Sequence, residues 1–577
     1  MSSSSFCMLA WHTIVKEASM RTSRMLVFIV ILLVAVPVVA KAEDLEVEFG
    51  DKGLSKLTYA GTDLLADGEF RITGAFFRKP DGTVYKAEEP GKLLPIAGAR
   101  PAYELAYPWG AVRISPAAKE DLLNITVDVT LEQGSDELVA MYLELGKLKF
   151  PKKPDFPNHS FLFYMRATVA HNLYHPGIVA ANYGPAAVVA CNEQIGRPLA
   201  FGFGRPEDEE QTIYPLLAYT GRHPMLKEKF PWIERRINPG GRDRWELSLR
   251  FASTGEAAAR VTDDLYRRYA EVFPYQLEWP DRRPIATIHP SSAHLGTGEA
   301  GPTTNPRGWI VGAWDDPIDV TTEKGRAHFK ERMMTYAVNS AKICKDMDAQ
   351  GVIVWSIEGQ EYPHMISYLG DPRSLPPEMV DVADEFFKAF TDAGLRTGLC
   401  IRPQRPLRSA YQPEVSQLGF AGRADRCSTL LAKIDYAKKR WGCTLFYLDS
   451  NVTWFGDPVK IPDAAGYTAG LDVETLKEIT EAHPDVLIVA EWEALRSYAY
   501  AAPYSQLNYN KELAPPDNVL LAYPDAFFVN NADEKSINIH RDALVGPVKR
   551  GDILFFAGWW PSPENKIVKE IYEKAKE

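Results

Sequence analysis

Two acidic residues directly follow two hydrophobic segments in the second half of the chain. Asp449 follows residues 445–448, and Glu491 follows residues 487–490. If these segments are adjacent parallel strands, about 4.8 Å apart, the carboxyl groups can approach the ~5–5.5 Å that a retaining glycosidase uses. Two carboxyl groups at that distance repel, so one should be ionised and the other protonated. This predicts Asp449 as nucleophile and Glu491 as general acid/base, with Glu493 as a reserve acid. The alternative is that each acid caps a helix or pairs with an arginine.

Other strand-like segments also end in polar or aromatic residues, which together have the composition of a sugar site. Arg402 could hold Asp449 ionised, bind substrate oxygens or form a structural ion pair. Acidic and amide groups bind sugar hydroxyls and indole rings stack on sugars, although core or rim packing explains any single Trp equally well. The predicted substrate-binding residues are Trp314, Asp315, Glu358, Glu361, His364, Arg402, Trp492, Asn530 and Trp559. Glu358, Glu361 and His364 could also bind a metal, but they match no known ligand motif, so neither a metal nor another cofactor is predicted.

The elements that must position these residues are alternating strands and helices, which are typical of βα units. Strands are predicted at 309–313, 352–357, 396–401, 444–448, 486–490, 526–529 and 553–556, with one more at 506–509 or 519–523. Helices are predicted at 323–347, 377–393, 423–440, 473–482 and 563–576. Eight such strands indicate a (β/α)8 barrel, whose catalytic residues lie at the carboxyl ends of the strands. Residues 285–289 are excluded as the first strand, because the Gly- and Pro-rich segment 290–307 contains no crossover helix.

The first half of the chain has a different pattern. From residue 43 to about 253, short runs with period-two alternation are separated by Gly, Pro and Asp, which indicates an antiparallel β-sandwich. A helical stretch at 256–269 follows. We therefore predict a signal peptide with an upstream extension at 1–42, a β-sandwich with a terminal linker helix at 43–275, and the barrel at 276–577.

The N-terminus carries the features of an export signal. Arg21 and Arg24 precede an apolar run at 25–40, and Ala40-Lys41-Ala42 supplies a cleavage site. The run is shorter than the ~20 residues of a membrane span, so cleavage is favoured over an uncleaved anchor. No later segment is predicted to cross a membrane, and the expected location is secreted or periplasmic. The cysteines show no C-x-x-C spacing; a bridge between Cys427 and Cys443 is conceivable, but the sequence does not establish it.

Composition and missing motifs exclude several other classes of protein. The 577 residues are 46% hydrophobic and 24% charged, which is globular, and 65 basic against 76 acidic residues give a formal charge of −11. No basic block stands out, so a nucleic-acid partner is not predicted. The Gly296-x-Gly298-x-x-Gly301 pattern does not join a strand to a helix and is assigned to a loop. The sequence contains no G-x-x-x-x-G-K-[ST], H-E-x-x-H or G-x-S-x-G motif.

The barrel half resembles the retaining α-glycoside hydrolases of the α-amylase-like and melibiase-like type. Residues 447–451 (Tyr-Leu-Asp-Ser-Asn) look like the fourth barrel strand of these enzymes, which ends in their nucleophilic Asp. Residues 490–492 (Ala-Glu-Trp) are similar to the strand-five acid segment of α-amylase-like and endo-α-N-acetylgalactosaminidase-like groups. Tyr447 stands where α-amylase-like enzymes carry an arginine. Many members of these families have an N-terminal β-sandwich before the barrel.

The residues and the resemblance together imply an exported, α-acting, retaining glycoside hydrolase whose partner is an oligo- or polysaccharide. The main alternative is a non-catalytic carbohydrate-binding protein on a degenerate hydrolase barrel. A lyase or epimerase on the same scaffold is a weaker third possibility.

Overall fold

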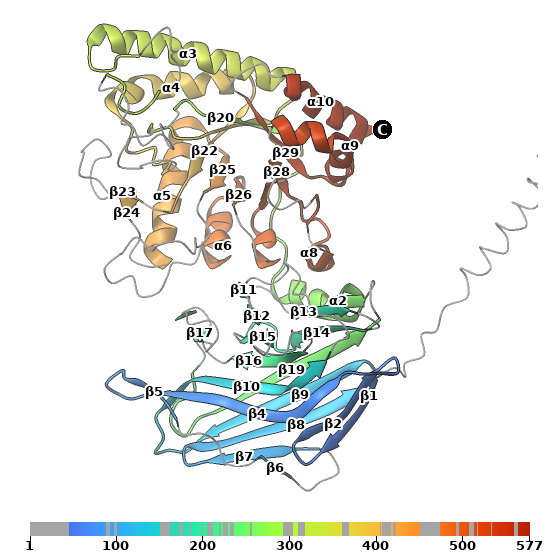
Figure 1. The fold of residues 1–577 in the computed structure, drawn as a ribbon. Helices are drawn as coiled ribbons and strands as arrows, with labels where there is room; N and C mark the ends of the chain where they lie inside the picture. The colour runs from blue at the N-terminus through green and yellow to red at the C-terminus, as the bar shows by residue number, and fades with distance from the viewer. Residues whose placement is uncertain are drawn as a thin grey trace, which may run out of the picture.

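A computed structural model provides the fold of this chain. It describes residues 45–87, 93–96, 101–149, 162–164, 167–171, 177–183, 186–197, 199–204, 212–218, 221–222, 229–230, 236–253, 257–291, 304–309, 318–359, 369–403, 405–406, 417–418, 423–449, 473–491, 495–506, 513–515, 517–531, 534–558 and 563–577. Within these ranges the chain forms two sets of elements, one rich in antiparallel strands and one with alternating strands and helices (Figure 1).

The N-terminal half contains two large antiparallel sheets. The first runs in the order β1 (Leu45–Gly50), β2 (Gly53–Tyr59), β4 (Leu65–Arg78), β10 (Glu137–Lys149), β16 (Thr212–Ala218), β15 (Ala200–Gly204), β12 (Ala167–His171) and β11 (Leu162–Tyr164), with β3 (Thr62–Asp63) beside β2 and β5 (Val84–Lys86) beside β4. The second runs in the order β13 (Gly177–Tyr183), β14 (Ala186–Asn192), β19 (Arg242–Ala252), β9 (Leu122–Leu131), β8 (Gly110–Lys119), β7 (Tyr103–Tyr107) and β6 (Leu94–Pro95). A short separate pair joins β17 (Gly221–Arg222) to β18 (Lys229–Phe230).

The alternating sequence pattern explains why these strands form a sandwich. Along β9 buried and half-buried residues alternate strictly, so that one face of the strand supplies the core. Leu123, Ile125, Val127 and Val129 on that face are at most 1% exposed. They belong to one apolar cluster with residues of the other sheet, including Phe77. The predicted antiparallel sandwich is confirmed.

Helix α2 (Ala257–Val272) connects the two halves of the chain. It packs against β14 and β19 of the sandwich and against α8 (Asp517–Ala522) of the second half, and Figure 1 shows it between them. The buried guanidinium of Arg250, on β19, forms ion pairs with Glu193 and with Asp264 of α2. The helix is therefore held to the sandwich by charge as well as by apolar contact.

The second half forms an eight-stranded parallel sheet, the barrel. The strands follow the order β26 (Leu487–Ala490), β25 (Leu445–Leu448), β22 (Arg396–Ile401), β21 (Gly351–Val354), β20 (Ile285–Ile288), β29 (Ile553–Ala557), β28 (Val529–Asn531) and β27 (Tyr504–Gln506). The helices on the outside are α3 (Glu323–Asp346), α4 (Pro377–Asp392), α5 (Arg423–Trp441), α6 (Val473–Ala482), η2 (Leu495–Ala499), α8, α9 (Glu534–Arg550) and α10 (Pro563–Lys576), and β23 (Arg405–Pro406) pairs with β24 (Gln417–Leu418). The predicted (β/α)8 barrel is confirmed.

The first barrel strand differs from the prediction. The segment Ile285–Ile288, which the sequence analysis excluded, is β20, and it pairs in parallel with both β21 and β29. Trp309 instead forms an antiparallel bridge to Ser291, and residues 310–313 lie outside the described residues. The exclusion was wrong because the crossover to β21 uses α3, which begins long after the Gly- and Pro-rich segment. One strand replaces another, so strands four and five keep their numbers.

The sixth strand had two predicted positions, 506–509 and 519–523. In the structure it is β27, which ends at Gln506, whereas residues 519–522 belong to α8. Neither of the two predicted segments therefore matches it closely.

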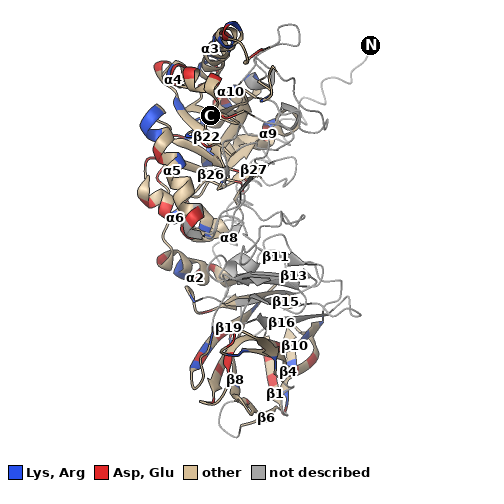
Figure 2. Ribbon diagram, turned by 90° about the vertical axis from the view of Figure 1, so that its left-hand side faces the viewer, with Lys and Arg blue, Asp and Glu red and all other residues tan. Residues whose placement is uncertain are grey.

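The barrel strands separate two apolar layers. Alternate residues face a cluster inside the barrel that includes Ile353, Cys400, Leu445 and Phe555, and the others face a large cluster beneath the helices. Residues of both charge signs occur along the outer helices (Figure 2).

The cysteines do not form the conceivable bridge. Cys427 and Cys443 are both buried, and neither forms a disulfide. Among the described residues, no helix is long and apolar enough to span a membrane. The predicted leader at 1–42 lies outside the described residues.

Candidate active site

Asp449 and Glu491 occupy equivalent places at the ends of adjacent strands. Leu448 of β25 is paired in register with Ala490 of β26, and the two acids come next in their strands. The Asp449 amide donates to the carbonyl of Ile401 at 3.0 Å, and the Glu491 amide donates to the carbonyl of Leu448 at 3.2 Å. The ladder therefore continues through both acids and fixes their backbones side by side.

Both acids lie on the interior side of their strands. Side chains alternate across a strand, so a residue shares a face with the residue two positions earlier. Tyr447 and Val489, two positions before the acids, belong to the interior cluster. Asp449 is buried and Glu491 is half-buried. Two strands thus deliver one carboxyl group each to the same end of the barrel.

Arg402 contacts the first of these acids directly. It follows β22, the neighbour of β25, and its Nη2 donates to Oδ2 of Asp449 at 2.9 Å. The two side chains are only 16% and 12% exposed. The sequence was compatible with Arg402 holding Asp449, binding substrate or forming a structural ion pair, and in the structure Arg402 is bonded to Asp449. A guanidinium in this position orients the carboxylate.

Tyr447, which was not among the predicted site residues, lies beside both acids. Burial raises the pKa of its hydroxyl well above its usual value, and electrostatic interactions with Glu491, Tyr504, Asp449 and Cys400 act in the same direction. The hydroxyl is therefore protonated at neutral pH and lies within electrostatic reach of both acids. Its position two residues before Asp449, on the same strand face, is the signal that could have identified it.

A layer of aromatic rings closes the barrel interior around Tyr447. Its ring centroid lies 5.0 Å from that of Trp355 and 5.1 Å from that of Tyr504, and Phe555 lies 6.0 Å from Tyr504. Trp355 also stacks on His289 at 5.2 Å. Burial lowers the pKa of His289 to about 4, so its imidazole is neutral at pH 7. Of these rings, Trp355, Tyr447 and Phe555 are buried and Tyr504 and His289 are half-buried, so the interior side of the site is lined mainly by apolar groups.

Glu358, a predicted sugar ligand, lies in an enclosed position. It is 4% exposed, and its Oε1 accepts a hydrogen bond from the amide of Gly370 at 2.9 Å. Burial raises the pKa of its carboxyl group. Gly370 has φ +57°, and a Cβ there would lie 1.9 Å from the carbonyl oxygen of Cys400. The carboxyl group thus holds a glycine turn against the third strand.

The two asparagines at the end of β28 face opposite sides. Phe528 belongs to the outer cluster and Val529 to the interior one, so alternation places Asn530 outward and Asn531 inward. Asn530 is fully buried, whereas Asn531 donates from its amide to the hydroxyl of Tyr504 at 2.5 Å. Asn531, rather than the predicted Asn530, therefore shares the face of the two acids.

The remaining predicted site residues lie outside the described residues. They are Glu493, Trp314, Asp315, Glu361, His364, Trp492 and Trp559. Within the described part of the chain, no three His, Cys, Asp or Glu side chains are grouped as metal ligands would be.

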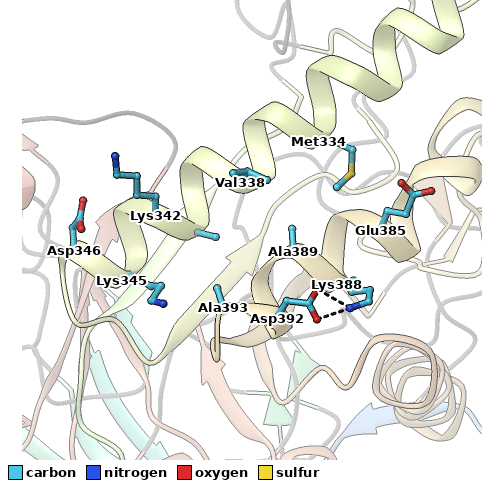
Figure 3. A pocket seen from close by; sticks show the side chains of 11 residues that line it. Met334, Val338, Lys342, Lys345, Asp346, Glu385, Lys388, Ala389, Asp392 and Ala393 are labelled. Atoms are coloured by element: carbon cyan, nitrogen blue, oxygen red, sulfur yellow. Dashed lines mark hydrogen bonds and ion pairs between the residues drawn. The ribbon is translucent and has the colours of Figure 1, made fainter.

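A groove on the outer helices is separate from this site. Its volume is about 720 Å³, and it lies between α3 and α4, where Val338, Lys342 and Glu385 are among its lining residues (Figure 3). Lys388 and Asp392 form an ion pair at its edge. None of the residues at the strand ends contributes to it.

Comparisons with known proteins identify the fold of the chain. No protein-family model matches the sequence, and a search of the curated proteins gives no match. Among solved structures, the α-N-acetylgalactosaminidase NagBb from Bifidobacterium bifidum, in complex with GalNAc, is similar over 92% of this chain and 92% of its own, with 12% identity and a TM-score of 0.51.

Two further structures match with lower TM-scores. The GH36 α-galactosidase AgaB from Geobacillus stearothermophilus covers 91% of this chain and 76% of its own, with 11% identity and a TM-score of 0.46. A GH31 sulfoquinovosidase from E. rectale covers 92% and 82%, with 10% identity and a TM-score of 0.47. At these low identities the similarity shows the fold alone. The chain has the β-sandwich and (β/α)8-barrel fold that NagBb also has.

Proposed function

We propose that this protein is an exported glycoside hydrolase that cleaves α-glycosidic bonds in oligo- or polysaccharides with retention of configuration. Asp449 is the nucleophile and Glu491 the general acid/base. One observation carries the proposal: the two acids end adjacent strands in register, on the interior face, with Arg402 bonded to Asp449. Catalytic groups of (β/α)8 barrels occupy this end of the strands.

The reaction proceeds in two displacements. In the first, Glu491 gives its proton to the glycosidic oxygen while the Asp449 carboxylate attacks the anomeric carbon; the C–O bond breaks and the leaving group departs as an alcohol. In the second, the Glu491 carboxylate takes a proton from water, whose oxygen attacks the same carbon and releases Asp449. Arg402 orients the attacking carboxylate throughout, and the aromatic layer keeps water from its interior side.

The α-configuration and export rest on separate arguments. NagBb, which shares the fold, is an α-N-acetylgalactosaminidase, and residues 447–451 resemble the nucleophile strand of retaining α-glycoside hydrolases. Export rests on Arg21 and Arg24 before the apolar run at 25–40 and on the cleavage site that ends at Ala42. If the leader is cleaved there, the mature protein secreted by a bacterial host begins at Glu43, which mass spectrometry of its N-terminal peptide measures. An intact leader on the exported protein would contradict cleavage.

The activity is tested with aryl α- and β-glycosides and a panel of polysaccharides. Wild type is expected to hydrolyse at least one α-glycoside, whereas Asp449→Asn and Glu491→Gln reduce kcat by about a thousandfold or more. Glu481→Gln, an exposed acid on α6, is the matched control and keeps wild-type rates. Activity that survives both site substitutions would remove the assignment. A wild type that binds glycans without cleaving any would favour the carbohydrate-binding alternative.

The stereochemical outcome separates two mechanisms. NMR of the first product formed is expected to show the α-anomer, as double displacement requires. The β-anomer would instead indicate a single displacement, for which carboxyl groups stand ~6.5–9.5 Å apart.

A further inference from the structure

Lys433 is a fully buried lysine in the middle of α5. Its exposed fraction is 0%, and its neighbours one turn away on the same helix face, Leu430 and Ala437, are also fully buried. Lysine is almost never fully buried without partners. Removing an ammonium from water costs several kcal/mol unless good hydrogen bonds compensate it. The hydrogen-bond partners of Lys433 must therefore compensate for its burial.

The ammonium binds two backbone carbonyls at the carboxyl end of the barrel. Nζ donates to the carbonyl oxygen of Leu369 at 2.6 Å and to that of Arg402 at 2.9 Å. The amide of Arg402 also donates to the carbonyl of Leu369, at 3.1 Å. These three hydrogen bonds link α5, the segment before Gly370 and the residue that follows the third strand, Arg402. That residue is the one whose guanidinium holds Asp449.

Charged groups surround the buried ammonium of Lys433 as well. Burial lowers its pKa to about 8, Asp371, Glu358 and Cys400 favour its charged form, and Arg373 opposes it. Asp371 already receives two hydrogen bonds from Arg373, each of 2.8 Å. Burial raises the pKa of Glu358. Lys433 is therefore a counter-charge of Glu358 as well as a donor to the two carbonyls, and its hydrogen bond to the Arg402 carbonyl is the contact that reaches the residue bonded to Asp449.

We propose that Lys433 is a positioning residue of the hydrolase site and acts through Arg402. By fixing the Arg402 carbonyl, it sets the height and direction from which the guanidinium reaches Oδ2 of Asp449. This inference rests on the proposed function, because it assigns a role in presenting the nucleophile. Without the ammonium, the Arg402 side chain is still present, but its backbone is free to shift. A shift of about 1 Å in a catalytic group can cost a hundredfold in rate.

A double-mutant cycle tests the proposal. The four proteins are wild type, Lys433→Met, Arg402→Gln and the double variant, with Lys439→Met, an exposed lysine on the same helix, as the matched control. Lys433→Met is expected to lower kcat by about ten- to a hundredfold with little change in KM. The double variant should be no more than about threefold slower than Arg402→Gln, because both changes disable one unit. Lys439→Met should match wild type.

A measurement that needs no substrate accompanies the cycle. Hydrogen exchange at the Arg402 amide is expected to be at least tenfold faster in Lys433→Met and unchanged in Lys439→Met. If Lys433→Met does not show the circular dichroism spectrum of a folded protein, Lys433→Gln replaces it in both experiments. Its amide is neutral, and its side chain is shorter than that of lysine.

The outcomes distinguish the two proposals. Additive losses in the cycle, or an unchanged kcat in a folded Lys433→Met, overturn the role of Lys433 while the active wild type leaves the hydrolase proposal intact. A wild type that cleaves no glycoside overturns the proposed function, and the positioning role falls with it. Non-additive losses with faster exchange at Arg402 support both.

Discussion

Arg402 donates a hydrogen bond from Nη2 to Oδ2 of Asp449 at 2.9 Å, joining the ends of the third and fourth barrel strands. Both side chains are largely buried. A buried ion pair adds little net stability, because desolvation of the two charges offsets their attraction. Stability alone is therefore a weak reason for this pair, whereas orientation of the carboxylate that we propose as nucleophile is a sufficient one.

The Arg402–Asp449 pair predicts a specific loss in Arg402→Gln. We expect kcat to fall by about ten- to a hundredfold, because a charge-assisted hydrogen bond to the carboxylate is worth ~1.5–3 kcal/mol. Steady-state kinetics on the best aryl glycoside measures it. Arg440→Gln is the control, since Arg440 forms a surface pair with Asp384 on the outer helices. Equal kinetics for the two variants would make the Arg402 pair structural only.

Tyr447 places a protonated hydroxyl within the field of both acids, which predicts a catalytic loss in Tyr447→Phe. The ring remains in the aromatic layer, so the melting temperature should change by only a few degrees. The lost hydroxyl should lower kcat by about tenfold or more. Tyr436→Phe, a substitution at an exposed tyrosine of α5, should leave kcat unchanged. A Tyr447→Phe enzyme as fast as wild type would show that the hydroxyl serves packing alone.

The sequence predicts most barrel helices because their signals are local. Helix α6 matches its predicted range of 473–482, and α4 begins at Pro377 as expected, where proline suits a first helical turn. Helix α9 was not predicted, because Gly546 and Pro547 interrupt its pattern, and yet the helix continues through Pro547. The first strand was missed for a topological reason, since its crossover helix begins more than thirty residues later.

The site could be predicted only in part, for a related reason. Asp449 and Glu491 are visible because an acid directly follows each buried strand, which is a local pattern. Lys433 is not, because a lysine in a helix ordinarily faces water and its burial depends on how α5 sits on the strand ends. Asn530 and Asn531 are adjacent, and only the register of β28 decides which one faces inward.

Glu358 predicts a pH dependence of stability. Its folded pKa is raised by burial above the ordinary 4.5, so unfolding releases a proton once the pH exceeds 4.5. The contribution of Glu358 to the free energy of unfolding is therefore complete below pH 4.5 and is lost as the pH rises toward the folded pKa. Glu358→Gln cannot ionise, so the variant should gain stability relative to wild type across this window. Urea unfolding at several pH values measures the difference, with Glu385→Gln, an exposed acid on α4, as control. Parallel curves for wild type and Glu358→Gln would contradict the assignment.

His289 predicts that stability also depends on pH in the opposite direction, with a loss of stability as the pH falls. Burial lowers its folded pKa from 6.5 to about 4, so between these values the unfolded chain binds a proton that the folded protein does not. Stability should therefore fall as the pH drops from 6.5 to 4, by at most roughly 3 kcal/mol from this group. His289→Phe keeps a ring against Trp355 but cannot take up a proton.

The His289→Phe substitution isolates this contribution to stability. Urea unfolding at pH 7 and pH 4.5 is expected to show a smaller acid loss for His289→Phe than for wild type. His540→Phe, at a half-buried histidine on α9, should keep the full acid loss, because the change leaves His289 in place. If His289→Phe and wild type lose the same free energy of unfolding, the imidazole takes up its proton in the folded protein. The ring would then be open to water, and the apolar layer beneath the two acids would not be sealed.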